Sequence, residues 1–300
     1  MQKQFLRRFH STGLRTLNGS ANSPRNSVSL LSSVPHLGAP SLVSVYDQKH
    51  VASIRDQLEN NGVLKISLGF QDDDCRYLEQ LVLNLHKYHG HGLPITHSAS
   101  RGWFWDVRPV PSSLQMQNQA RSETMENFPW HTDCSYERSP PRFFALQVLQ
   151  PDRCGGGTLS VLKVDQALGL LSPSARAALA QPEYRFAVPP EFVKSDERHI
   201  VGSVLGTDGS SRSVQLRFRE EIITPITTDA EVALQELKTM LCMPEASAET
   251  LHLTPAFLPR GSIILMDNRR WLHARNQVQD PNRHLRRVRW DARPFLAGSL

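Results

Sequence analysis

The sequence lacks the features that mark several common protein classes. None of its apolar runs approaches the ~20 residues that a membrane-spanning helix requires, so we expect no membrane partner. Its four cysteines form no C-x-x-C pair, which argues against a disulfide scaffold or a zinc ribbon and indicates a reducing compartment. We also find no G-x-S-x-G, P-loop or G-x-G-x-x-G motif, so nothing supports a serine hydrolase, an NTPase or a dehydrogenase.

Acidic residues are absent from the first 46 positions, which carry five of the 34 Lys and Arg residues. The rest of the chain therefore has 29 basic and 29 acidic residues, and the net charge of +5 comes from the N-terminal segment alone. A nucleic-acid-binding domain normally carries its basic excess on the folded part. We therefore expect no nucleic-acid partner.

Residues 1–40 are rich in Ser, Asn and Arg, with apolar positions between the arginines. This composition is typical of a mitochondrial transit peptide, and a disordered tail is the alternative interpretation. The segment thus predicts a mitochondrial location, with the cytoplasm as the alternative.

Hydrophobic periodicity in the rest of the chain predicts many short strands with helices outside them. Such a pattern fits a double-sheet fold better than an alternating βαβ fold. The predicted class is mainly β with flanking helices (α+β), with a double-stranded β-helix, or jelly roll, as its core. Helices are predicted over 47–60, 72–88, 164–180 and 230–243, and strands over 63–68, 142–149, 158–162, 263–266 and 285–290, with further short strands within 184–228.

The motif Trp130-His131-Thr132-Asp133 places an imidazole and a carboxylate two positions apart. On an extended strand both side chains leave the same face, so they can bind one metal ion. Two histidines and one carboxylate on one side of iron(II) leave open positions for oxygen chemistry, and His273 can supply the second histidine. The alternative for each histidine is a buried side chain that only hydrogen-bonds.

Further motifs follow in a fixed order: Pro140-Pro141, Gly156-Gly157-Thr158, the run from Gly261 through Asp267-Asn268 to Leu272-His273, and Arg283-His284-Leu285. Together with the first motif they resemble the TauD/TfdA group of iron(II)- and 2-oxoglutarate-dependent dioxygenases, which are clavaminate synthase-like enzymes. The resemblance covers about residues 42–295. It departs from the family pattern at Ser262, where members usually have aspartate.

The resemblance implies a role for each matching residue. His131, Asp133 and His273 would form the catalytic centre as ligands of Fe(2+), and 2-oxoglutarate and O2 would be the co-substrates. Thr158 and Arg283 would bind the distal carboxylate of 2-oxoglutarate. An arginine fork and a hydroxyl group are both suited to bind a carboxylate.

Three further residues are candidates for ligand binding by resemblance. Arg287 lies where the family's sulfonate enzymes hold the substrate's acid group, so we assign it to the co-substrate and substrate sites. The alternative for Arg287 is a surface or ion-pairing role. His97 and Asn127 fall in regions where relatives contact the substrate.

The implied activity is oxidation of a C–H bond in a small carboxylate- or anion-bearing molecule, by hydroxylation, desaturation or cyclisation, with release of succinate and CO2. Asp133 argues against halogenation, because halogenases of this chemistry have a small residue there. Two alternatives are a zinc-dependent hydrolase that uses the same triad and a non-catalytic binding protein. Residues 184–243 match no motif, and we expect them to form an inserted lid.

Overall fold

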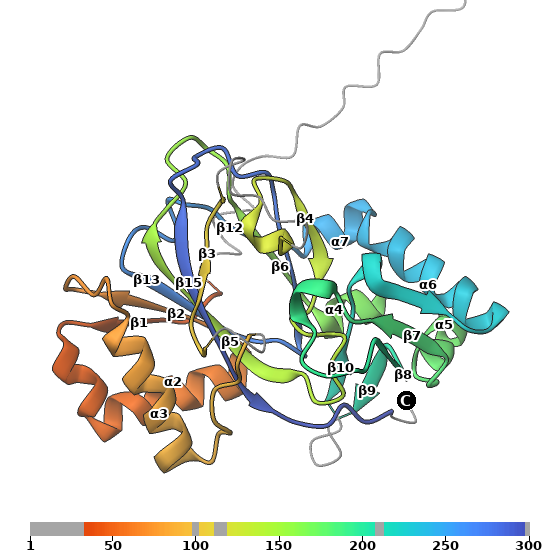
Figure 1. The fold of residues 1–300 in the computed structure, drawn as a ribbon, viewed down its shortest axis with the longest axis horizontal. Helices are drawn as coiled ribbons and strands as arrows, with labels where there is room; N and C mark the ends of the chain where they lie inside the picture. The colour runs from red at the N-terminus through yellow and green to blue at the C-terminus, as the bar shows by residue number, and fades with distance from the viewer. Residues whose placement is uncertain (1–32, 98–101, 111–118, 208–212, 298–300) are drawn as a thin grey trace, which may run out of the picture.

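Two β-sheets form the framework of the domain. A computed structural model describes residues 33–97, 102–110, 119–207 and 213–297. The strands of the two sheets are β1 (His36–Ala39), β2 (Val63–Leu68), β3 (Trp105–Val107), β4 (Phe128–His131), β5 (Pro141–Gln150), β6 (Leu159–Lys163), β12 (Leu251–Leu253), β13 (Ser262–Asp267), β14 (Trp271–Arg275) and β15 (His284–Ala292). The larger sheet has the order β1-β2-β13-β5-β15-β3, and the smaller has the order β12-β6-β14-β4. The two sheets face each other as the walls of a jelly roll (Figure 1).

The central strands contribute to two cores at once, because successive residues of a strand point to opposite faces. In β5, Phe144 points into the space between the sheets and Phe143 points outward. In β13, Ile264 likewise points into the space between the sheets and Ile263 points outward. The inner face of the larger sheet therefore lines the interior of the jelly roll.

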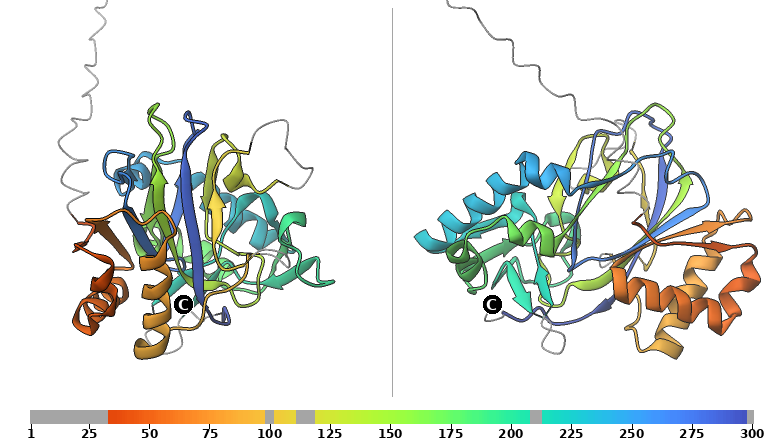
Figure 2. Two further views of the ribbon diagram at one scale, coloured as in Figure 1. Left: turned by 60° about the vertical axis from the view of Figure 1, so that its left-hand side comes forward. Right: turned by 180° about the vertical axis from the view of Figure 1, so that it is seen from behind.

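Two helices, α2 (Gln48–Asn61) and α3 (Arg76–His89), cover the outer face of the larger sheet (Figure 2). The carboxylate of Asp47 caps α2 by accepting a hydrogen bond from the Lys49 amide. The helix ends at Gly62, whose φ of 71° is a left-handed conformation that glycine adopts readily. Both helices were predicted from periodicity, although α3 begins at Arg76 rather than near residue 72.

A third layer, which we call the outer layer, comprises residues 164–207 and 213–248 and packs on the outer face of the smaller sheet through Leu162 and Leu272 (Figure 1). It contains the region that was expected to form a lid. Its elements are α4 (Val164–Gly169), α5 (Pro173–Leu179), β7 (Tyr184–Ala187), β8 (His199–Gly202), β9 (Leu205–Thr207), β10 (Val214–Leu216), the 3-10 helix η5 (Glu220–Ile222), β11 (Ile223–Pro225), α6 (Thr228–Leu241) and α7 (Pro244–Ala248).

Two details of the outer layer correct the sequence prediction. The helix predicted over 164–180 is divided, because the hydroxyl of Ser172 accepts the Ala175 amide and starts a new helix there. The helix predicted over 230–243 is α6, which begins and ends two residues earlier, and on it Val232 is 62% exposed whereas Ala230 and Ala233 are buried. The buried face of α6 includes alanines, which a search for large apolar residues overlooks.

The ordered fold extends further toward the N-terminus than the expected boundary at residue 42. Residues 36–39 form β1, which pairs in parallel with residues 65–68 of β2. Most of the segment predicted to be a transit peptide lies outside the described residues. In the described part of the chain, no helix has both the length and the apolar character needed to cross a bilayer.

His91 gives the stability of this fold a pH dependence. It is buried, its Nδ1 accepts a hydrogen bond from the Trp290 indole at 3.0 Å, and its ring stacks on Phe143. Burial lowers the pKa of His91 to about 4. Between pH 6.5 and 4, His91 is therefore protonated in the unfolded chain but neutral in the folded chain. The free energy of unfolding decreases as the pH falls through this range. We expect a loss of about 2 kcal/mol in the free energy of unfolding between pH 7 and 4.5 from this group.

Urea unfolding of wild type and His91→Gln at both pH values measures this contribution. Glutamine retains an acceptor for Trp290 but does not titrate, so the variant should lose less stability on acidification than wild type. Equal losses in the two proteins would show that His91 is not the source.

Candidate metal centre and co-substrate site

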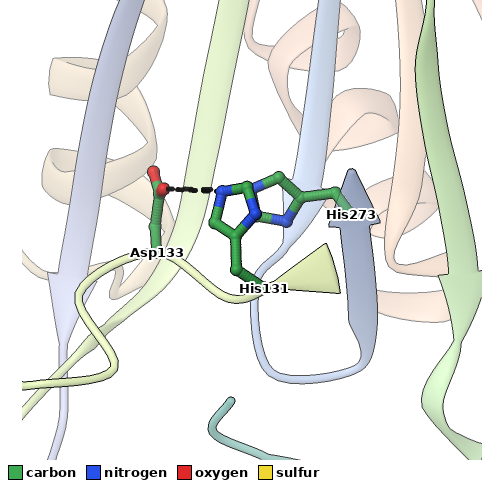
Figure 3. Close-up of side chains that lie close together, drawn as sticks. All are labelled: His131, Asp133 and His273. Atoms are coloured by element: carbon green, nitrogen blue, oxygen red, sulfur yellow. Dashed lines mark ion pairs between the residues drawn. The ribbon is translucent and has the colours of Figure 1, made fainter. Parts of the chain in front are cut away.

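Strand pairing brings His131 and His273 together. The strands β4 and β14 are antiparallel, and these two residues are direct partners in the pair. Their ring centroids lie 4.1 Å apart. Asp133 lies in the turn beyond β4 rather than on the strand, which corrects the extended geometry assumed from the sequence, and its carboxylate lies beside the imidazoles (Figure 3).

The three side chains surround a space of the size of a metal ion. One ligand atom from each lies within 4.8 Å of the others. The Nε2 atoms of His131 and His273 are 3.9 and 3.8 Å from Oδ1 of Asp133, too far for hydrogen bonds. The Nδ1 of His131 donates to the carbonyl of Pro129 at 2.7 Å, which leaves the lone pair on Nε2. The buried Oδ2 of Asp133 has no hydrogen-bond partner in the described structure.

The charge states of the cluster suit a cation. Burial, reinforced by His273, holds the pKa of His131 well below its usual value, so the ring is neutral at pH 7. Burial alone would raise the pKa of Asp133. Arg287, which donates to its Oδ1 at 3.1 Å, helps to outweigh that effect and hold the pKa well below the usual range. An ionised carboxylate with two imidazoles fits a divalent first-row metal such as iron(II).

Asn268 holds Asp133 in place. Its Oδ1 accepts the backbone N–H of Asp133 at 2.7 Å, and its Nδ2 donates to the carbonyls of Asp133 and Pro141 at 2.9 and 3.0 Å. The sequence placed Asn268 in a motif but gave it no role. The Asp267-Asn268 pair before His273 was the signal that pointed to it.

Arg283 lies just before β15 in a buried position. It is 5% exposed, and its Nη1 has no hydrogen-bond partner within the described residues. Burial lowers the pKa of Arg283 to about 10. The nearby Asp152 gives it little compensation, because the Asp152 carboxylate already accepts hydrogen bonds from four backbone amides. The charge of Arg283 is therefore free for an anionic ligand.

The surroundings of Arg283 shape a cavity inside the jelly roll, lined by apolar side chains such as Leu146 and Leu285. Gly157 leaves room for the guanidinium, since a Cβ atom there would lie 2.9 Å from the Arg283 Nε. Thr158 follows Gly157, is half-buried, and bonds through its backbone amide to the side chain of Asn276 at 2.7 Å.

Comparison with known proteins decides the family. The chain matches the sequence model described as "Taurine catabolism dioxygenase TauD, TfdA family" over residues 30–289. The chain belongs to the TauD, TfdA family. The family prediction from the sequence motifs is thus confirmed.

Among the relatives of this TauD, TfdA chain is an L-asparagine oxygenase of Streptomyces coelicolor, with 32% identity over 195 residues. The alignment covers 65% of this chain and 54% of the relative, so the chain spans about half the length of that protein. The fold is similar to an asparagine oxygenase structure with Fe(II), 2S,3S-3-hydroxyasparagine and succinate (TM-score 0.61, 23% identity, 91% and 89% coverage). It is also similar to the non-heme iron oxygenase OrfP with Fe and alpha-ketoglutaric acid (TM-score 0.58, 18% identity, 91% and 90% coverage). These similarities confirm the predicted jelly-roll class.

The remaining predicted residues of the TauD, TfdA site lie in different environments. Arg287 lines a cavity beside the triad. His97 is buried behind it, where Nδ1 accepts from Arg289 at 2.7 Å and Nε2 donates to the Trp103 carbonyl at 3.0 Å. Asn127 is exposed and is not among the described residues that line this cavity.

Arg219 also lines the cavity beside the triad, and the sequence gave no indication of it. It lies in the outer layer and is far from every family motif along the sequence. Only the three-dimensional pairing of residue 219 with His131 reveals its position.

Proposed function

We propose that the protein is an iron(II)- and 2-oxoglutarate-dependent dioxygenase that oxidises a C–H bond of a small, anion-bearing molecule. One observation carries the proposal: a buried cluster of two histidines and a carboxylate shares the jelly-roll interior with a buried arginine whose Nη1 has no hydrogen-bond partner among the described residues. A zinc hydrolase needs such a triad but has no use for the arginine. Family membership and the alpha-ketoglutaric acid bound to OrfP support the same function.

Iron(II) held by His131, Asp133 and His273, together with 2-oxoglutarate and dioxygen, supplies the chemistry that yields succinate, CO2 and an oxidised substrate. The chain's own part is to position the reactants. Arg283 and Thr158 would bind the distal carboxylate of 2-oxoglutarate through charge-assisted hydrogen bonds and so fix its orientation.

Residues around the triad hold the ligands and limit access by water. The hydrogen bond from His131 to Pro129 fixes the tautomer that presents Nε2. Phe128 stacks on the His131 ring with centroids 3.7 Å apart, and Phe144 lies 4.7 Å from the His273 ring. These ring contacts restrict rotation of the two imidazoles and shield their sides from water.

Formation of succinate by the wild-type protein tests the proposal. Protein prepared without oxygen is given iron(II) and 2-oxoglutarate and then exposed to air, because slow turnover of the co-substrate does not require the substrate. We expect oxygen uptake and succinate that depend on iron and stop when zinc replaces it. If iron gives no succinate while zinc binds tightly, the redox proposal fails, and the zinc hydrolase or the non-catalytic binding protein takes its place.

A further inference from the structure

Four arginines from three parts of the chain line the cavity beside the triad, and one of them, Arg121, is paired with the exposed Glu126 at 2.6 Å. Arg287 and Arg289 come from the inner face of β15, and Arg219 comes from the outer layer, between β10 and η5. Within the described residues, Asp133 is the one carboxylate that lines this cavity. Since Asp133 is a metal ligand in the proposed function, the rest of the lining is neutral or cationic.

Arg219 is held close to the metal ligands. Residue 219 forms an antiparallel bridge with His131. Its guanidinium lies 5.4 Å from the ring centroid of Phe128, which is the ring that stacks on His131. Its Nη2 donates to the partly exposed Glu221 at 3.2 Å, whereas its buried Nε has no partner in the described chain. An inner N–H group of Arg219 is therefore available to a ligand.

Among the described residues that line the cavity, the charges of the complete site would not balance without a further anion. Iron(II) and Arg283 together bring three positive charges, which Asp133 and the two carboxylates of 2-oxoglutarate neutralise. Of the remaining arginines, Arg121 and Arg219 have carboxylate partners, Glu126 and Glu221, that do not line the cavity, and Arg287 and Arg289 are buried. Arg289 donates to uncharged groups, the Sγ of Cys134 and the ring of His97. Arg287 shares Asp133 with the metal, and buried cations without counter-ions are unfavourable.

We propose that the substrate carries two acid groups and no free ammonium group, with one acid group bound by Arg287 and the second by Arg219. This inference rests on the proposed function and narrows its substrate class to small dicarboxylates, including N-acylated acidic amino acids. It separates this chain from the relatives named for asparagine oxidation, because free asparagine carries an ammonium group. No carboxylate other than the metal ligand lines the described cavity to receive that group.

Binding to the full chain loaded with zinc and 2-oxoglutarate tests the proposal, because zinc permits calorimetry without turnover. The probes are N-acetyl-L-aspartate, N-acetyl-L-asparagine, which has an amide in place of the second carboxylate, and L-asparagine, which carries the ammonium group. We expect N-acetyl-L-aspartate to bind at least about tenfold more tightly than the other two, since one hydrogen bond to a charged group contributes that much.

Variants of Arg219 test whether this side chain causes the preference for the second carboxylate. Arg219→Gln should abolish the preference for the second carboxylate without weakening N-acetyl-L-asparagine, and Arg219→Lys should restore part of it. Arg185→Gln is the matched control, because Arg185 lies on β7 of the same layer and is exposed.

Three results would overturn the proposal: no dianion preference in wild type, no binding of N-acetyl-L-aspartate at all, or an undiminished preference in Arg219→Gln. Tighter binding of L-asparagine would also overturn it. That result would point to Glu191, which lies within electrostatic range of Arg219, as an acceptor for an ammonium group. Succinate formation with iron but no dianion preference rejects this inference alone, whereas absence of succinate rejects the proposed function.

Discussion

Replacing His273 with alanine should abolish metal binding and all metal-dependent turnover while the chain still folds. Loss of an outer partner of a ligand reduces metal affinity 10- to 100-fold, so loss of a ligand itself should exceed roughly 100-fold. In wild type, metal at a hundred times its dissociation constant should add about 2.7 kcal/mol to the free energy of unfolding. Thermal melting with and without iron(II) or zinc measures this gain, and we expect none in His273→Ala.

His252→Ala is the matched control for this substitution. His252 is an exposed histidine on β12 that hydrogen-bonds to Ser160 at 2.9 Å, so its loss should leave the metal-induced shift and succinate formation unchanged. An undiminished shift in His273→Ala would remove this residue from the metal site and, with it, the basis of the proposed function.

The sequence motifs pointed to His131, Asp133 and His273 as one set, and the structure places the three side chains in one buried cluster. Along β15 the period of two puts Arg287 and Arg289 on one face, and both line the cavity beside the triad, whereas Arg283 precedes the strand and lines a different cavity. Asp133 was expected on the same extended strand as His131, and this expected geometry was wrong. Its carboxylate reaches the histidines from a turn whose geometry depends on Asn268, 135 positions away.

Contacts between the outer layer and the jelly roll could not be predicted. The backbone amide of Thr132 donates to the carbonyl of Phe218 at 2.7 Å, and the Phe218 amide donates to the Thr132 hydroxyl at 3.1 Å, across 86 positions. These bonds bring the neighbouring Arg219 to the cavity. Neither periodicity nor motif spacing carries information about such a pairing, because it depends on how two independently patterned layers pack.

Arg283→Met should stabilise the protein in the absence of 2-oxoglutarate and greatly weaken binding of that co-substrate. Burial lowers the pKa of Arg283 from the usual value of an arginine side chain to about 10. Below pH 10 the guanidinium is charged in both the folded and the unfolded state. Its lowered pKa means that the folded state disfavours this charged form. Replacing the guanidinium should therefore raise the free energy of unfolding by about 3 kcal/mol. Methionine also fits the apolar side chains that line the cavity.

Urea unfolding with and without 2-oxoglutarate separates the two effects, and Arg286→Met serves as the control. Arg286 is the neighbour of Arg287 on β15, but its Nε donates to Asp106 at 2.9 Å, so its replacement should reduce stability and leave 2-oxoglutarate binding intact. Wild type should gain stability when 2-oxoglutarate is added, and Arg283→Met should not. If Arg283→Met instead lost stability and kept its affinity for 2-oxoglutarate, the guanidinium would have a structural partner, and the co-substrate would have to be anchored elsewhere. A gain in stability in Arg283→Met would show that burial of this guanidinium costs the folded protein stability.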